Sequence, residues 1–170
     1  MKSTPCYPIC FLSFVLCLFG PSVSVATPAA RAEASVPFRA TYTLDLQMVV
    51  NPPFGIITST GTAIGTHLGH ATARSVEETV NLATGAGVAT HEFTAANGDV
   101  ILVDFLFTAI PTSETDFTVD GTWEISGGTG RFADTTGSGS YSGQVQFTSP
   151  VTAAASFEME GTLSVPGAVK

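Results

Sequence analysis

The stretch GTWEISGGTGRFADTTGSGSYSG, residues 121–143, carries most of the information about the fold. It joins two segments in which apolar and polar residues alternate. In the first segment the apolar face is formed by Phe117, Val119, Gly121, Trp123 and Ile125. In the second it is formed by Tyr141, Gly143, Val145 and Phe147. Alternation with a period of two residues predicts strands that have one buried and one solvated face.

The centre of this stretch predicts a structural turn. Three glycines permit a sharp reversal with positive φ: Gly127, Gly128 and Gly130. We expect Phe132 to fold under the end of the sheet as a plug, and Arg131 to pair with Asp134 or with carbonyl oxygens of the loop. The spacing of Gly128, Gly130 and Ala133 also matches a dinucleotide fingerprint, but the residues that follow, TTGSGSYSG, cannot form the helix that phosphate binding requires. The sequence therefore indicates no cofactor.

The same alternation occurs along nearly all of the chain after Val36. In FRATYTLDLQMVV, for example, the apolar face is Phe38, Ala40, Tyr42, Leu44, Leu46 and Met48. About eight such segments are separated by turn signals, among which Asn97-Gly98 predicts the two central residues of a hairpin turn. No window shows a helical period over ten residues.

Eight consecutive strands predict an all-β domain over residues 37–166. Closing the sheet into an antiparallel meander barrel removes the exposed edges of the sheet. An eight-stranded barrel has an interior that side chains fill, or that holds one small ligand. A two-sheet β-sandwich is the alternative, and the absence of long crossover connections favours the barrel.

The first 26 residues are typical of a cleaved export signal, and residues 27–36 of a flexible leader. Lys2 precedes an apolar core of signal-peptide length. A small-x-small cleavage site ends at Ala26, and Ala30-Arg31-Ala32 is a second option. This core is too short for a membrane span, which needs roughly 20 apolar residues. All three cysteines lie inside the signal: Cys6, Cys10 and Cys17. We expect an exported protein, secreted or periplasmic, that has no membrane span and no thiol after cleavage.

The charge of the chain argues against nucleic acid as a partner. Six basic residues face fourteen acidic ones, and the net charge is −8. Binding to nucleic acid depends on neutralising phosphates with basic side chains. The acidic residues are scattered, which is typical of a solvated surface.

The glycine-rich stretch resembles a turn of the allene oxide cyclase-like and dirigent-like barrels. These families carry Gly-Gly-(Thr/Ser)-Gly-x-Phe before a late strand, as residues 127–132 do here. Together with Thr66-His67-Leu68-Gly69 and residues 94–99, the stretch is similar to exported bacterial proteins of that fold with no assigned activity. The resemblance implies an eight-stranded barrel of the lipocalin-like, or calycin-like, kind and a trimer in the plant families. The polar residues that plant allene oxide cyclases use inside the barrel have no match in this chain.

Polar side chains on predicted inward faces are the candidates for chemistry. The candidate acid–base residues are Glu78, His91 and Asp104. Glu78 shares a predicted face with Val76 and Val80, although a one-residue bulge would exchange it with Glu77. A buried carboxylate must be paired or must change its pKa, which is how acid–base sites are built. Candidate aromatic walls of a binding site are Tyr42, Trp123 and Tyr141.

A metal site is not expected. His67 and His70 have the spacing of a metal motif, but positions three apart on a strand face opposite sides of the sheet. Two functions then remain open. The first is an exported, non-enzymatic barrel that binds a small apolar ligand or acts as a structural module. The second is a cofactor-free isomerase or cyclase resembling allene oxide cyclase, with acid–base groups inside the barrel.

Overall fold

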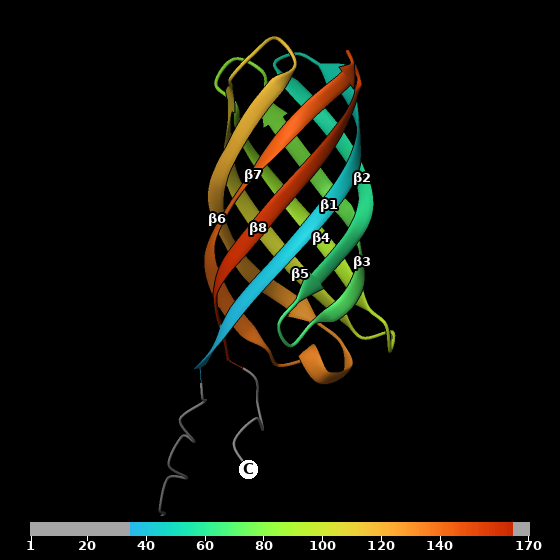
Figure 1. Cartoon of the computed structure of the whole chain (residues 1–170), viewed down its shortest axis with the longest axis vertical. Coiled ribbons are helices and arrows are strands. Elements are labelled where there is room, and N and C mark those ends of the chain that lie inside the picture. The colour runs from blue at the N-terminus through green and yellow to red at the C-terminus, as the bar shows by residue number, and fades with distance from the viewer. Residues whose placement is uncertain (1–34, 165–170) are drawn as a thin grey trace, which may run out of the picture. The chain divides into compact units, whose positions relative to one another are not determined.

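Residues 35–164 are described by a computed structural model, and they form one sheet of eight strands (Figure 1). The strands are β1 (Ser35–Asn51), β2 (Phe54–Gly65), β3 (Gly69–Asn81), β4 (Ala86–Ala95), β5 (Val100–Pro111), β6 (Asp116–Gly128), β7 (Thr136–Ser149) and β8 (Thr152–Ser164). A short 3₁₀ turn, η1 (Gly130–Phe132), lies between β6 and β7.

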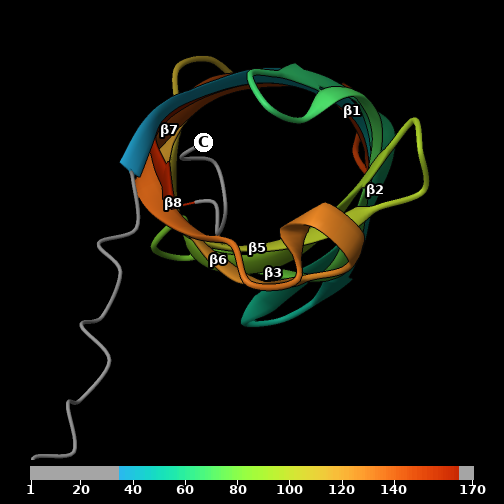
Figure 2. The same ribbon diagram turned by 90° about the horizontal axis from the view of Figure 1, so that it is seen from below.

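The sheet closes on itself. Each strand pairs antiparallel with the next in sequence, and β1 pairs with β8 from Ser35↔Ser164 to Gln47↔Thr152. Figure 2 shows the resulting ring of strands, seen from the end at which η1 lies. The predicted meander barrel is confirmed, and the alternative of a two-sheet sandwich does not apply. The strand β1 begins at Ser35, inside the range predicted as a leader.

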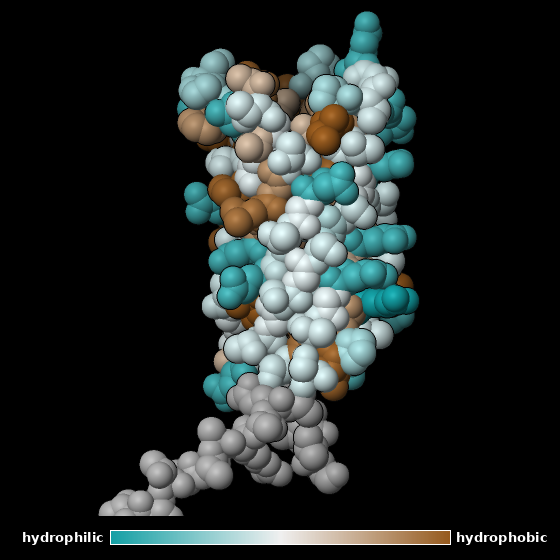
Figure 3. All heavy atoms as spheres, turned by 90° about the vertical axis from the view of Figure 1, so that its left-hand side faces the viewer, coloured by the Kyte–Doolittle hydropathy of each residue, from teal (hydrophilic) through white to brown (hydrophobic). Residues whose placement is uncertain are grey.

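The alternation of the sequence becomes the inside and outside of the barrel. In β1 the buried residues are Phe38, Ala40, Tyr42, Leu44 and Leu46, and the residues between them are exposed. Fully burying one large apolar side chain stabilises the fold by about 1.5–3 kcal/mol. The outer surface is mostly hydrophilic or of intermediate hydropathy on the face shown in Figure 3, where hydrophobic side chains form separate small groups.

A β-bulge in β3 interrupts the alternation. Ser75 pairs with His91, whereas Glu77 pairs with Thr90, so β3 has one extra residue at Val76. The pairing of β3 with β2 shifts in the same region. An extra residue exchanges the two faces of a strand: Val76 is 55% exposed, whereas Glu78, two positions later, is buried. The predicted face shared by Val76 and Glu78 is wrong, yet Glu78 points inward because the bulge lies before it.

The η1 turn closes one end of the barrel. Phe132 is 2% exposed, as the sequence predicts, and the turn Gly65–Gly69 contributes the buried Leu68 beside it. Of the three glycines predicted to permit positive φ, only Gly130 adopts it, at +56°. Arg131 does not pair with Asp134. Its Nη2 donates to the carbonyl oxygen of Leu68 (3.0 Å), and its Nε lies 3.8 Å from Asp99 Oδ2.

The turn between β4 and β5 differs by one position from the prediction. The Gly98 amide donates to the carbonyl oxygen of Ala95 (2.8 Å), so Ala96 and Asn97 are the central residues. Gly98 follows them with φ +88°. A type I turn followed by a glycine in the left-handed region is the common three-residue hairpin connection.

The predicted signal peptide, most of the leader and all three cysteines lie outside the described residues. Within residues 35–164, no helix is long and apolar enough to cross a membrane.

Candidate functional site

A cavity of about 200 Å³ lies inside the barrel, in the half away from η1. Its wall includes Leu82 and Gly85 of the turn between β3 and β4, so the cavity reaches that rim. The half next to η1 leaves only about 10 Å³ between its side chains, among them Phe38, Trp123 and Leu163. The barrel is therefore closed at one end and hollow toward the other.

Aromatic and aliphatic side chains from all eight strands line the cavity. Its aromatic members are Tyr42, Phe105, Phe107, Phe117, Tyr141, Phe147 and Phe157. The rings of Tyr42 and Phe157 stack at a centroid distance of 4.9 Å, and Phe105 meets Tyr141 edge-on at 4.8 Å. Because packed rings hold one another in place, the wall at the level of Tyr42 is preorganised rather than formed by loose side chains.

A hydrogen-bonded carboxylate and imidazole interrupt this apolar wall. His91 Nε2 lies 3.1 Å from Glu78 Oε2, and both side chains are buried. The hydroxyl of Ser59, also buried, donates to the same carboxylate oxygen at 3.3 Å. A buried carboxylate that accepts hydrogen bonds from two side chains is partly compensated for the loss of water.

The bulge in β3 is what brings these groups together. It turns both Ser75 and Glu78 toward the inside, although they are three positions apart in one strand. The Oγ of Ser75 accepts a hydrogen bond from the backbone amide of Ser59 (2.7 Å). Bulges disrupt the ladder locally and leave a backbone group to be satisfied by another partner. Here a side-chain hydroxyl takes that place and ties β2 to β3 beside the carboxylate.

The other ring nitrogen of His91 has no partner. Nδ1 is buried and makes no hydrogen bond to any described residue. The hydrogen bond between His91 and Glu78 therefore uses Nε2, whose N–H donates to the carboxylate.

Two tyrosines face the same space. Burial, with a smaller contribution from the charge of Glu78, raises the pKa of Tyr141 far above its ordinary value. Burial is also the main reason why the pKa of Tyr42 is raised. Neither hydroxyl hydrogen-bonds to another residue within 35–164, and neither is sealed inside the wall. Both phenols are neutral, and their hydroxyls remain available to a molecule in the cavity.

Asp104 does not belong to this site. It lies on the outer face of β5, where its carboxylate accepts hydrogen bonds from Thr90 (2.7 Å) and Ser126 (3.0 Å). The inward residues of this strand are Ile101, Val103, Phe105 and Phe107. The sequence misleads here because β5 is apolar on both faces, so the pattern does not distinguish inside from outside.

Trp123 is buried but does not line the cavity. It packs edge-on against Phe38 in the filled half, at a centroid distance of 5.4 Å. Its Nε1 donates to the carbonyl oxygens of Ser140 (3.0 Å) and Glu160 (3.2 Å). Trp123 therefore has a structural role, and of the three predicted wall residues only the two tyrosines reach the cavity.

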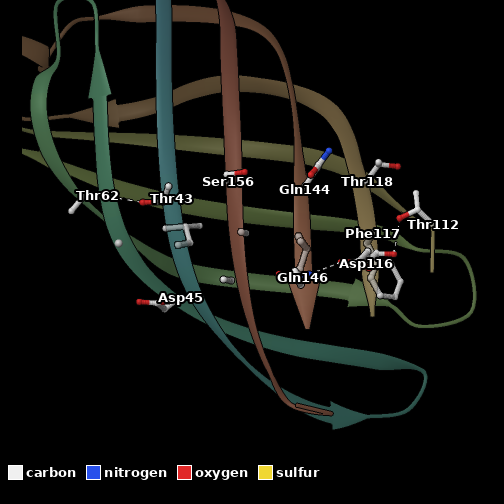
Figure 4. Close-up of a pocket in the computed structure, with 15 residues that line it drawn as sticks. Thr43, Asp45, Thr62, Thr112, Asp116, Phe117, Thr118, Gln144, Gln146 and Ser156 are labelled. Atoms are coloured by element: carbon white, nitrogen blue, oxygen red, sulfur yellow. Dashed lines mark hydrogen bonds between the residues drawn. The ribbon is translucent and has the colours of Figure 1, made fainter. Parts of the chain in front are cut away.

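A larger hollow, of about 780 Å³, lies on the outside of the barrel (Figure 4). It extends across β8, whose outward Ala154 and Ser156 are small, and hydroxyl, amide and carboxylate side chains surround it. Its polar groups are exposed or half-buried, and some pair with one another, as Gln146 Nε2 does with Asp116 Oδ1 at 3.1 Å. Because no buried polar group faces this hollow, we place the candidate site in the internal cavity.

Metal-ligating side chains do not converge in the described barrel: no group of three His, Cys, Asp or Glu residues is arranged to hold an ion. His67 lies in the turn between β2 and β3 with φ +64°, and His70 is exposed at the start of β3.

Sequence reasoning missed Ser59 and Ser75. Ser59 is in phase with the inward Ile57 and Ala63, so the alternation of β2 contains the signal that identifies it. Ser75 carries no such signal, because its orientation and that of Glu78 are reconciled only by the bulge.

The described chain is thus an eight-stranded antiparallel barrel whose cavity contains a hydrogen-bonded carboxylate and imidazole. No family model matches the chain, and no curated protein matches it. A solved structure of a dirigent protein, a pterocarpan synthase, is similar over 82% of this chain and 91% of that one, with 15% sequence identity and a TM-score of 0.40. A likeness at this level concerns the barrel and carries no argument about function.

Proposed function

We propose that the protein binds one small, predominantly apolar molecule inside the barrel. The supporting observation is the cavity of about 200 Å³ that aromatic and aliphatic side chains enclose and that contains unpaired polar atoms. An engineered apolar cavity of about 150 Å³ holds benzene, so this one suits a single ring with a short substituent. Hydrophobic burial provides the affinity of such sites, and a few polar groups orient the ligand.

Mass spectrometry of small molecules retained by the natively purified protein tests this proposal. The matched control is Ala89→Leu, because Ala89 lines the cavity and is small. We expect a retained molecule, or binding of added ethylbenzene by calorimetry, in the parent protein and neither in the variant. A parent protein that binds neither, or a variant that binds as well as the parent, would contradict the proposal.

Acid–base catalysis is a second candidate, and one observation favours it. Two of the three predicted acid–base residues, Glu78 and His91, meet at 3.1 Å in the wall of a cavity. A positioned carboxylate or imidazole can remove a proton from a bound molecule and return it elsewhere, which is the chemistry of a cofactor-free isomerase. If this is the function, a bound ligand takes up deuterium from D₂O, and Glu78→Gln stops the exchange. A ligand that binds but takes up no deuterium would contradict catalysis and support binding alone.

Export from the cell remains a sequence-based prediction, and a homo-oligomer, as a trimer, is implied only by the resemblance to the plant families.

A further inference from the structure

The hydrogen bonds of Glu78 leave half of its carboxylate open. Oε2 accepts from Ser59 and His91. Oε1 accepts no hydrogen bond from any residue between 35 and 164, and it is not among the sealed polar atoms of the wall. Because Glu78 lines the cavity, this oxygen is an acceptor that a ligand in the cavity can use.

The described residues supply no permanent positive charge to this carboxylate. Residues 35–164 contain no lysine and three arginines. Arg39 pairs with Glu160 and Arg74 with Glu92 on the outer face. Arg131 lies at the η1 end against Asp99.

The hydrogen bond of His91 goes to Oε2, so it leaves Oε1 free. The oxygens of a carboxylate inside an apolar site are ordinarily paired. On the Oε1 side of Glu78 that position is open to the ligand.

The rest of the wall suits a cation. Aromatic rings attract positive charge through their negative faces, and small cages of aromatic side chains recognise organic ammonium groups in this way. The hydroxyls of Tyr42 and Tyr141 are two further acceptors without protein partners. With Glu78 Oε1 they offer three acceptors, and a primary ammonium group has three donors.

We propose that the ligand of the cavity is a small aromatic amine, bound as an ammonium ion to Glu78, with its ring among the aromatic side chains. This inference rests on the proposed binding function and adds the charge of the ligand to it. A carboxylic acid of the same size is excluded by its negative charge beside Glu78. A neutral alcohol lacks both the ion pair and the attraction to the rings.

Four probes of similar size separate these cases in calorimetric titrations of the purified protein at neutral pH: 2-phenylethylamine, 2-phenylethanol, 3-phenylpropanoate and ethylbenzene. We expect the amine to bind about tenfold or more tighter than the alcohol, as one charged contact in a desolvated site allows. The propanoate should show no binding. An alcohol or acid that binds as tightly as the amine would overturn the inference.

The variant Glu78→Gln keeps the size of the side chain and removes its charge. We expect its affinity for the amine to fall about tenfold, to that of the alcohol, while ethylbenzene binds as in the parent protein. If Glu78→Gln does not fold, Tyr141→Phe replaces it, because it removes one acceptor and should weaken the amine while ethylbenzene binds as before. Unchanged amine affinity in the folded variant would overturn the inference. If ethylbenzene binds but the amine gains nothing over it, only the amine inference fails; if no probe binds, the proposed binding function itself fails.

Discussion

The half of the barrel next to η1 is filled, whereas the half next to the turn between β3 and β4 is hollow, although the same eight strands build both. The filled half contains large buried side chains, among them Phe38, Trp123, Phe132 and Leu163. In the hollow half Gly85, Ala89 and Ala109 form part of the wall. The comparison shows that strand alternation decides which side chains point inward, and side-chain volume decides whether they fill the space.

The two halves also differ in polarity. The buried Ser59, Glu78 and His91 form one hydrogen-bonded group, and two of them line the cavity. The small void of the filled half is lined by apolar residues alone. In the hollow half, free space thus lies beside a buried polar group, which is the combination expected of a binding site.

Phe132→Ala should show the largest effect. Truncating a fully buried phenylalanine costs about 3–5 kcal/mol, because the removed contacts leave a void that the neighbours fill only partly. Its matched control is Phe147→Ala in the hollow half, where the ring is half-buried beside existing free space. Urea denaturation should show a clearly smaller loss for Phe147→Ala. If both variants lose the same free energy of unfolding, the two halves of the barrel do not differ in packing.

Adding volume should give the opposite contrast between the halves. Ala95→Leu places three more carbons near the η1 end, where Ala95 is 3% exposed, and overpacking costs about 1–3 kcal/mol. Ala89→Leu places the same atoms at the cavity, so we expect little loss of stability together with loss of ligand binding. Thermal melts and calorimetric titrations of both variants measure this. An Ala89→Leu protein that is as unstable as Ala95→Leu would mean that the cavity has no usable space.

Gly98→Ala tests the backbone of the turn between β4 and β5. A Cβ at Gly98 would meet nothing within 4 Å, so only its φ of +88° opposes the change. The left-handed region costs a residue with a Cβ about 1 kcal/mol or more. Gly127→Ala is the control, because Gly127 has no positive φ and its Cβ would meet only Leu102 at 3.7 Å. If the denaturation midpoints of Gly98→Ala and Gly127→Ala shift equally, backbone strain at Gly98 does not explain the loss of stability.

Arg131→Ala should have the smallest effect. Its side chain is 47% exposed, and its guanidinium pairs with Asp99 at 3.8 Å and lies 4.7 Å from the centre of the Phe132 ring. Exposed ion pairs contribute about 1 kcal/mol or less and weaken with salt. The melting temperatures of the variant and the parent should differ at low salt and become more similar at high salt. A loss as large as that of Phe132→Ala would mean that the charge, rather than the ring, closes this end.

Much of the barrel follows from the local pattern. Alternation identifies the inward residues of β1 and β6, such as Tyr42 and Val119, because a strand places every second side chain on the same face. It also identifies His91 in β4, between Ala89 and Phe93. Phe132 could be recognised because a large apolar residue among glycines gains stability only by being buried.

Alternation does not identify the inward residues where a strand is apolar on both faces or contains a bulge. In β5, Asp104 sits among apolar residues on both faces and is outside. In β3 the bulge at Val76 makes Ser75 and Glu78 face the same way, which no fixed period describes. Trp123 is correctly placed inside, but its position along the axis, away from the cavity, depends on its packing against Phe38.

The sequence by itself determined that residues 35–164 form eight strands, which residues of most strands face inward, and which turn closes one end. These features follow from periodicity and local backbone preferences. Only the tertiary structure decided that the carboxylate of Glu78 meets His91 and Ser59, and that a cavity remains beside them. These features depend on strand register, on one bulge and on the sum of side-chain volumes from all eight strands. Contacts between residues that are distant in sequence set those quantities, and no local pattern contains them.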